Sequence, residues 1–200
     1  MVKVGVTGGI GSGKTLLCRK WAELGAEWMN ADEVAKSLME TDAELVSEIK
    51  KRFGDKSYGK DGRLNRTYLS REAFQNQRIE ELNELVHPVV YRETRRRIEE
   101  AEKKGIQVFI KEAALLLKYG RPDNVDVIVV VTAPEHLRIK RVAERDGLTA
   151  EEVKSRISRQ QTQEEMMEYA DYILENDQET EAFLHKAEDL FNTLKSGGHG

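Results

Sequence analysis

Short apolar runs alternate along the chain with stretches whose apolar residues recur every three or four positions. Residues 2–6, 107–110 and 126–131 are rich in β-branched residues, which predicts buried strands. Residues 26–29 and 172–175 predict two shorter strands. Strands separated by helices indicate an α/β fold, in which a parallel sheet carries helices on both faces.

Helical periodicity fills most of the sequence between these runs. Leu17, Trp21 and Leu24 share one face of a helix predicted over residues 16–24, and Gly25 is typical of a helix end. Thr149 and Glu152 match a capping box, which predicts the start of another helix. The further helices are predicted over residues 42–53, 134–145, about 150–163 and 179–195.

The stretch from about residue 31 to 102 contains several helical patterns and no convincing strand pattern. Residues 54–66 include three glycines and predict a loop, whereas residues 67–97 predict mostly helix with a break near Pro88. This stretch is long for a simple crossover between parallel strands. We therefore interpret it as a helical insertion beside the sheet.

Composition narrows the kind of protein further. Hydrophobic residues make up 39% and charged residues 34% of the 200 residues, which is typical of one ordinary globular domain. No apolar run approaches the roughly 20 residues of a membrane span, and the net charge of −4 disfavours nucleic acid and membrane surfaces as partners. The single cysteine, Cys18, excludes an internal disulfide and fits a reducing compartment. We expect a cytoplasmic monomer.

A glycine-rich loop between the first predicted strand and helix is the strongest chemical signal. Residues 8–15 match G-x-x-x-x-G-K-[ST] in full, a pattern that binds nucleotide phosphates. Its glycines let backbone N–H groups approach phosphate oxygens, and the following helix directs its positive end at the same anion. The alternative, a glycine turn with an incidental lysine, does not explain this position between a strand and a helix.

The motif assigns a task to each polar residue of the loop. Lys14 is predicted to reach the β- and γ-phosphates of ATP, and Thr15 to place its hydroxyl on Mg²⁺. The other residues predicted to bind ATP are Gly9, Gly11, Ser12, Gly13 and Leu16. The loop indicates a nucleoside triphosphate and its metal, but not the reaction.

Features outside the loop separate the classes of protein that carry it. A GTP-dependent switch requires Asn-Lys-x-Asp, which the sequence lacks, and motor ATPases usually have an apolar strand that ends in aspartate. Arg138, Arg141 and Arg145 are spaced by three and four residues and so share one helix face. Such a face is either solvated or part of a lid that neutralises a transferred phosphoryl group. With the loop, it favours a small-molecule kinase.

Several further motifs occur in a fixed order along almost the whole chain. They are Val6 to Lys14; Asn30-Ala31-Asp32; Val86-His87-Pro88; Glu112-Ala113-Ala114-Leu115-Leu116; Arg141 through Arg145-Asp146-Gly147 to Arg156-Ile157 and Gln160; and Ala170-Asp171-Tyr172-Ile173 with Asn176. This ordered set resembles the dephospho-coenzyme A kinase family. Four positions depart from the motifs: Asn30 and Glu112 replace aspartates, Ala114 replaces a proline, and Lys118 falls where many members have glutamate.

The resemblance implies a P-loop kinase fold of three layers, α/β/α, with a five-stranded parallel sheet in the order 2-3-1-4-5. It implies a core at about residues 1–30, 103–136 and 165–195, an acceptor-binding insertion at about 31–102 and a helical lid at about 137–164. The implied reaction phosphorylates the ribose 3′-hydroxyl of dephospho-coenzyme A with ATP and Mg²⁺, the last step of coenzyme A synthesis.

Site residues follow from the same resemblance. Asp32 is the implied general base or hydroxyl-orienting group, with Lys14, Arg141 and Arg145 as the other catalytic residues. His87 and Glu112 would lie near the acceptor, and Asn176 near the adenine of ATP.

Alternatives stay open for the site residues and for the function. Asp32 could be a helix N-cap, His87 a structural residue and Glu112 a carboxylate at a helix N-terminus. The basic run from Arg92 to Arg97 could bind a pyrophosphate or be a solvated helix face. The functional alternatives are another small-molecule or nucleoside monophosphate kinase, and a non-catalytic nucleotide-binding switch.

Overall fold

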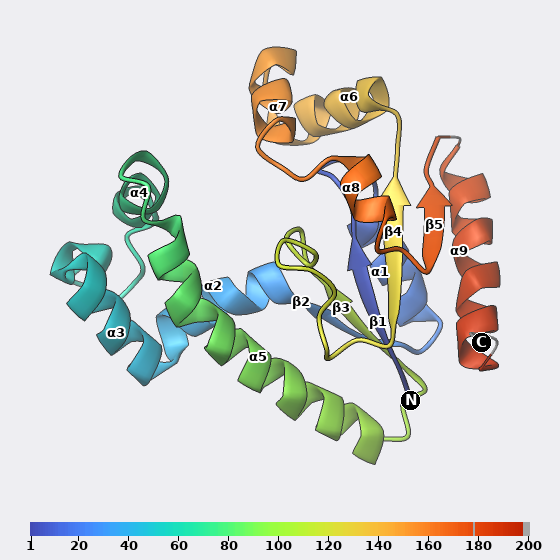
Figure 1. Cartoon of the computed structure of the whole chain (residues 1–200), viewed down its shortest axis with the longest axis horizontal. Helices are drawn as coiled ribbons and strands as arrows, with labels where there is room; N and C mark the ends of the chain where they lie inside the picture. Colours follow the sequence, from blue (N-terminus) through green and yellow to red (C-terminus); the bar gives the residue numbers. More distant parts are fainter. Residues whose placement is uncertain (178, 198–200) are drawn as a thin grey trace. The chain divides into compact units, whose positions relative to one another are not determined.

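The computed structural model describes residues 1–177 and 179–197, which include a five-stranded parallel sheet (Figure 1). The strands are β1 (Val2–Thr7), β2 (Glu27–Asn30), β3 (Val108–Glu112), β4 (Val127–Thr132) and β5 (Tyr172–Glu175). Their order is β2-β3-β1-β4-β5. The α/β class and the implied order 2-3-1-4-5 are both confirmed.

The register of the sheet brings the carboxyl ends of the strands to one edge. Val6 of β1 pairs with Glu112 of β3, and Asn30 of β2 also pairs with Glu112. Ligands of open parallel sheets bind outside this edge. The glycine loop, which directly follows β1, therefore begins where such a site is expected.

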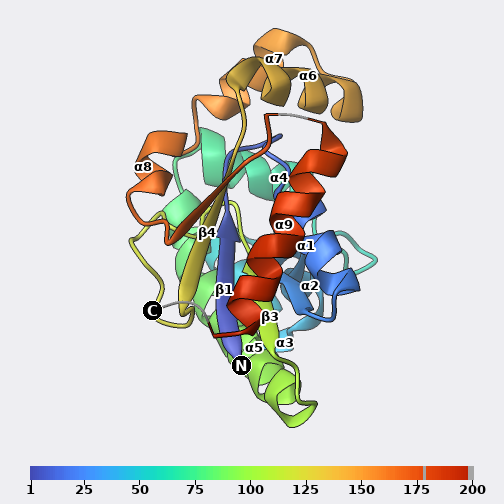
Figure 2. The ribbon, with the colours of Figure 1, turned by 90° about the vertical axis from the view of Figure 1, so that its right-hand side faces the viewer.

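One face of the sheet is covered by α1 (Lys14–Glu23) and α9 (Thr180–Lys195), which lie side by side (Figure 2). Trp21 of α1 is fully buried between them and the strands, and its Nε1 donates a hydrogen bond to the carbonyl of Ala187 at 2.7 Å. Each large apolar side chain buried in this way contributes about 1.5–3 kcal/mol to stability. This packing anchors the helix that begins at the glycine loop.

The opposite face is covered by the chain that follows β3 and by a short helix, α8 (Gln163–Met167). Gly5 faces this side, because Val4 and Val6 face the α1 side and alternate strand residues point to opposite faces. A Cβ on Gly5 would lie 2.7 Å from Leu116 Cδ2. The absence of a side chain at Gly5 therefore lets the segment after β3 pack directly on the sheet.

Residues 31–97 form a second compact unit, and residues 1–30 and 98–200 form the first. The second unit contains α2 (Ala31–Thr41), α3 (Ala43–Phe53), α4 (Arg66–Ser70) and most of α5 (Ile79–Lys103). Its own core includes Leu45, Ile49, Phe53, Tyr58, Leu69 and Val86. The stretch predicted to be helical is thus built around a separate apolar cluster.

The helix break predicted near Pro88 was wrong. Helix α5 runs through Pro88 without a break, although proline lacks an N–H donor and normally interrupts a helix. Val86, Val89 and Val90 pack in the core on both sides of Pro88, so tertiary packing outweighs local propensity. Residues 54–65 form the predicted loop, which includes a 3-10 turn at Asp55–Ser57 and ends where α4 begins at Arg66.

The helix predicted over about 150–163 is divided into α7 (Ala150–Ile157) and α8. The predicted capping box at Thr149 and Glu152 is confirmed. A second capping box, between Thr162 and Glu165, starts α8 and accounts for the division.

In the described parts of the chain, no helix has the length and apolar character needed to cross a bilayer.

Candidate functional site

The glycine loop adopts a conformation that few other residues could. Gly8, Gly11 and Gly13 have φ angles of +147°, +78° and +107°. Such values are accessible to glycine and costly for residues with a Cβ. Gly13 is the N-cap of α1 and offers no side chain to its first turn. The backbone N–H groups at this end of the helix are therefore suited to binding an anion.

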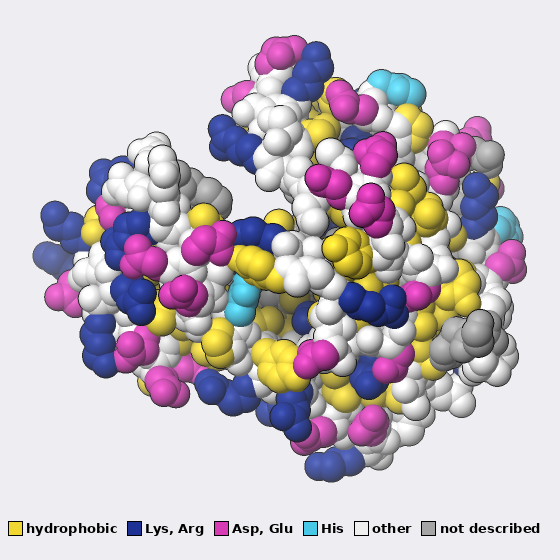
Figure 3. Space-filling view, in the orientation of Figure 1, with side chains coloured by type: hydrophobic (Ala, Val, Ile, Leu, Met, Phe, Trp, Pro, Cys, Tyr) yellow, Lys and Arg dark blue, Asp and Glu magenta, His cyan; other side chains and the backbone are white. Residues whose placement is uncertain are grey.

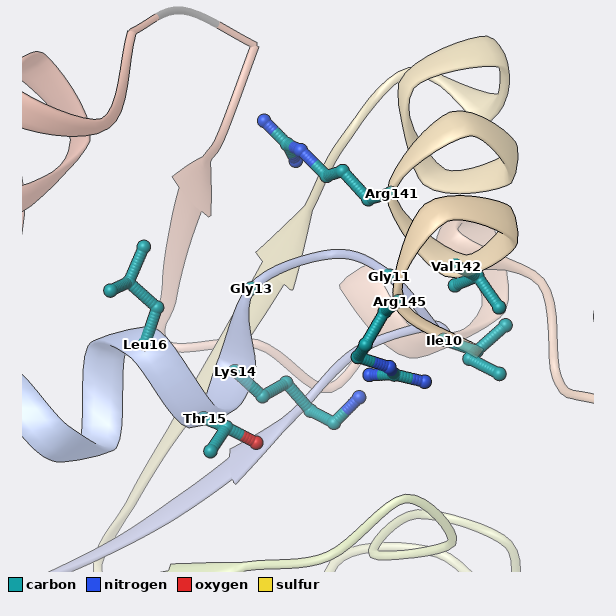
Figure 4. Close-up of a pocket in the computed structure, with 9 residues that line it drawn as sticks. All are labelled: Ile10, Gly11, Gly13, Lys14, Thr15, Leu16, Arg141, Val142 and Arg145. Carbon is teal, nitrogen blue, oxygen red and sulfur yellow. The ribbon is translucent and has the colours of Figure 1, made fainter. Parts of the chain in front are cut away.

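A cavity of about 260 Å³ opens beside the loop (Figure 4). It is lined by Ile10, Gly11, Gly13, Lys14, Thr15, Leu16, Arg141, Val142 and Arg145. Five of the residues predicted as ATP-binding and two predicted as catalytic arginines thus border one space. In Figure 4 the side chains of Lys14 and Arg145 extend toward the same region, whereas that of Arg141 points away from it.

Lys14 lies against the loop that precedes it. Its Nζ donates to the carbonyls of Gly8 at 2.7 Å and Gly9 at 3.1 Å. Carbonyl oxygens are weaker partners for an ammonium group than charged phosphate oxygens are. The ammonium is thus positioned at the loop and could exchange these contacts for phosphate.

Thr15 and Glu112 form the contact between α1 and the end of β3. Thr15 Oγ1 donates to Glu112 Oε1 at 2.8 Å, although 97 residues separate them. Glu112 is only 3% exposed and also accepts from Trp28 Nε1 at 3.1 Å and Asn30 Nδ2 at 3.3 Å. Hydroxyl and carboxylate oxygens are ligands that suit Mg²⁺. Glu112 therefore lies beside the predicted metal residue Thr15.

Cys18, one turn after Lys14, is buried under this group. Burial raises the pKa of its thiol well above the usual value, and the neighbouring Glu112 carboxylate raises it further. A thiol with a raised pKa stays protonated and unreactive.

Asn176 lies behind the loop and connects it to α6 (Glu135–Asp146). Its Nδ2 donates to the carbonyl of Ser12 at 2.8 Å, and its Oδ1 accepts from Arg141 at 3.1 Å. A Cβ on Gly13 would lie 2.3 Å from the same Nδ2. The Asn176 amide thus joins the loop at Ser12 to α6 at Arg141.

Arg138 and Gln160 hold the backbone of Ile10 from both sides, a role that the sequence did not reveal. Arg138 Nε donates to the Ile10 carbonyl at 3.0 Å, and Gln160 Oε1 accepts from its N–H at 2.9 Å. Arg138 is 5% exposed, and this burial lowers the pKa of its guanidinium. Gln160 belongs to one of the ordered motifs and Arg138 to the predicted arginine face, but only the folded chain brings them to the loop.

Arg145 is held by its sequence neighbour at the end of α6. Its Nε donates to Asp146 Oδ1 at 2.7 Å, and Arg156 approaches the same carboxylate at 3.5 Å. The Arg145 guanidinium keeps the pKa of Asp146 below its usual value. Asp146 therefore stays ionised and orients Arg145, which borders the cavity.

Asp32 and His87 belong to the helical unit. Asp32 lies exposed within the first turn of α2 and not before it, so the N-cap interpretation was wrong. A carboxylate there is favoured by the positive end of the helix. His87 is exposed on the continuous helix α5, where no break accompanies Pro88.

The basic run on α5 is largely paired with acidic residues. Arg96 and Arg97 each lie 2.7 Å from Glu93, and Arg92 lies 3.5 Å from Asp42. The arginines lower the pKa of Glu93 to about 2. Figure 3 shows basic and acidic side chains interspersed over α3 and α5. This arrangement supports the interpretation of the run as a solvated helix face.

Gly8 provides a test of the loop's geometry. We expect Gly8→Ala to lower the free energy of unfolding by about 3 kcal/mol, because a positive φ and overpacking each cost about 1–2 kcal/mol. Its Cβ would lie 2.1 Å from the rigid backbone carbonyl of Val131. Gly25→Ala is the matched control, since Gly25 has φ +100° and nothing within 4 Å of its Cβ position. Equal losses in urea denaturation would contradict the proposed collision.

The fold and this arrangement define a class. A glycine loop after the first strand of a 2-3-1-4-5 parallel sheet, with a lysine and a threonine opening the next helix, is the architecture of P-loop kinases. Within that class, the chain belongs to the dephospho-CoA kinase (CoaE) family, whose sequence profile matches residues 2–182. The resemblance stated from the motifs is confirmed.

Individual relatives cover nearly the whole chain. It is 39% identical to the dephospho-CoA kinase of Salinibacter ruber, over 98% of this chain and 100% of that one. It is 40% identical to the dephospho-CoA kinase of Chlorobium luteolum, over 96% of this chain and 90% of that one. Among solved structures, TT1252 from Thermus thermophilus matches with a TM-score of 0.80 and 28% identity, covering 96% of both chains.

Proposed function

We propose that this protein transfers the γ-phosphoryl group of ATP to the ribose 3′-hydroxyl of dephospho-coenzyme A, the last step of coenzyme A biosynthesis. The observation that carries this proposal is the cavity beside the glycine loop, bordered by Lys14, Thr15 and Arg145, in a chain whose family match spans residues 2–182. We further propose that it acts as a cytoplasmic monomer.

On the ATP side of the reaction, the proposal depends on positively charged side chains near the transferred phosphoryl group. Phosphoryl transfer passes through a loose transition state whose negative charge spreads over the phosphoryl oxygens, so positioned cations supply most of the catalysis. Lys14 would move from the carbonyls of Gly8 and Gly9 to the β- and γ-phosphates. Arg145, oriented by Asp146, would neutralise the transferred group, and Arg141 would act beside it after its side chain turns from Asn176 toward the cavity.

Mg²⁺ fits the residues at the end of β3. The hydroxyl of Thr15 would bind the ion directly, and Glu112 would hold it through water, since both offer the hard oxygen ligands that Mg²⁺ prefers. When bound, the ion offsets the charge of the β- and γ-phosphates. Glu112 would at the same time accept the hydrogen bond from the Thr15 hydroxyl.

The acceptor half of the proposal relies on the helical unit. Asp32 would orient the ribose hydroxyl and accept its proton as the new bond forms. Because the transition state is largely dissociative, positioning supplies much of this effect. His87 would lie near the acceptor, and residues of about 31–102 would bind it.

The remaining parts of the chain would form the core and a lid. We assign the core to about residues 1–30, 103–136 and 165–195 and the lid to about 137–164. Closure of the lid would exclude water, which would otherwise compete with the acceptor for the phosphoryl group.

An acceptor assay tests this function. Purified protein with Mg²⁺ and ATP is offered dephospho-coenzyme A and, separately, a panel of nucleoside monophosphates. We expect ADP to form only with dephospho-coenzyme A, and mass spectrometry to find a product heavier by one phosphate. Turnover confined to the monophosphates, or no transfer to any acceptor, would overturn the proposal.

A further inference from the structure

The Glu112 carboxylate receives hydrogen bonds from several side chains on two neighbouring elements. Thr15 and Cys18 approach it from α1, and Trp28 and Asn30 approach it from β2. All four donors are uncharged side chains. Glu112 is 3% exposed, and none of these four donors carries a positive charge that would compete with a cation for the carboxylate.

The two oxygens of this carboxylate have different partners. Oε1 accepts from Thr15 at 2.8 Å, whereas Oε2 accepts from Trp28 at 3.1 Å and from Asn30 at 3.3 Å. Two donors on Oε2 fix the rotation of the carboxylate about its last bond. Oε1 is thereby held toward Thr15.

Trp28 is well suited to this task. Its indole N–H can donate a hydrogen bond but not accept one, so the hydrogen bond with Glu112 has only one possible direction. The ring also packs against the apolar cluster between the sheet and α1, which restricts its orientation. Asn30 lies opposite Glu112 in the register between β2 and β3, so the side-chain amide of Asn30 is attached to the backbone next to Glu112.

The orientation of Glu112 determines what Thr15 can bind. A hydroxyl has one proton to donate and two lone pairs to offer. Because Thr15 donates its proton to Oε1, its lone pairs are directed away from Glu112 and are available to a cation. Partners that orient a ligand in this way typically change metal affinity by about 10–100-fold.

We propose that Trp28 and Asn30 are positioning residues that fix Glu112, so that Thr15 presents its oxygen to the divalent cation bound with ATP. This inference rests on the proposed function, because it concerns the same cation. It adds two residues of β2, 84 and 82 positions away from Glu112 in the sequence, to the residues that govern the metal.

The test measures binding without any acceptor. A non-hydrolysable ATP analogue is titrated by calorimetry at a series of Mg²⁺ concentrations and again with a chelator. For Trp28→Phe we expect the Mg²⁺ concentration at half-maximal binding to rise about tenfold, while binding in chelator stays within about twofold. Asn30→Ala should change the Mg²⁺ dependence in the same direction.

Trp21→Phe is the matched control, because it removes an indole N–H that bonds Ala187 in the core instead. It should lower the thermal stability and leave the Mg²⁺ dependence unchanged. The chain has two tryptophans, so the fluorescence of Trp21→Phe reports on Trp28 alone. We expect that emission to change when Mg²⁺ and the analogue bind.

A double-mutant cycle separates positioning from general destabilisation. In a Glu112→Gln background, Trp28→Phe should have little further effect on the Mg²⁺ dependence, because it acts through Glu112. Equal Mg²⁺ dependence in Trp28→Phe and the unaltered protein would overturn the inference and leave the proposed function intact. Failure to bind the analogue under any condition would overturn both.

Discussion

Lys14→Ala should reduce kcat for phosphoryl transfer by about 10³-fold while the fold persists. The variant loses the ammonium that borders the cavity beside the glycine loop. Loss of one preorganised donor to developing negative charge costs about 10²–10³ in rate, and here the donor also carries a charge. Single-turnover assays with saturating ATP would measure the loss.

Stability should change little in Lys14→Ala. Lys14 Nζ donates to two carbonyls of its own loop, and alanine is a good helix former at the start of α1. Lys20→Ala serves as the control, because Lys20 lies on the same helix and pairs with Glu188 at 2.9 Å on the surface. It should retain full activity. Turnover in Lys14→Ala close to that of the unaltered protein would refute the role assigned to Lys14.

Asp32→Asn should lower kcat by about 10²–10³-fold with nearly normal affinity for ATP. The amide keeps the size of the carboxylate but cannot accept a proton, and it orients a hydroxyl less strongly than a charge does. Steady-state kinetics with dephospho-coenzyme A, together with calorimetry for ATP, would distinguish catalysis from binding.

Glu33→Gln is the control for helix electrostatics. Glu33 is the neighbouring carboxylate in the first turn of α2, and it pairs with Lys36 at 2.6 Å. If Asp32 contributed only through the helix dipole, both variants would lose at most about 1 kcal/mol of stability and neither would lose activity. An unchanged kcat in Asp32→Asn would leave that smaller role as the whole function of the residue.

The sequence predicted best those features that depend on neighbouring residues. The loop of residues 8–15 was identified because its spacing alone specifies its conformation, and the capping box at Thr149 because its two members lie three positions apart. Pro88 was misjudged because the core of the helical unit, and not local propensity, determines the course of α5. The sheet order became available through the resemblance, since patterning does not specify which strands are adjacent.

Contacts between distant residues were the part that the sequence could not supply. Nothing in the spacing of Arg138 or Gln160 indicates that both hold Ile10, and Trp28 gave no sign of a polar partner. These contacts depend on strand order and on the path of the chain after β4. Asn30 departs from a motif that has aspartate at this position, and beside Glu112 its amide donates a hydrogen bond that an ionised aspartate could not donate.

The supports of the glycine loop also have a consequence for synthesis of the chain on the ribosome. Ile10 is held by residues 128 and 150 positions later, and Ser12 by Asn176, 164 positions later. The loop thus leaves the ribosome well before its supports. A nascent chain carries the complete motif without the contacts that hold it in shape until residues 138, 160 and 176 have been made, so the supported loop forms only after them.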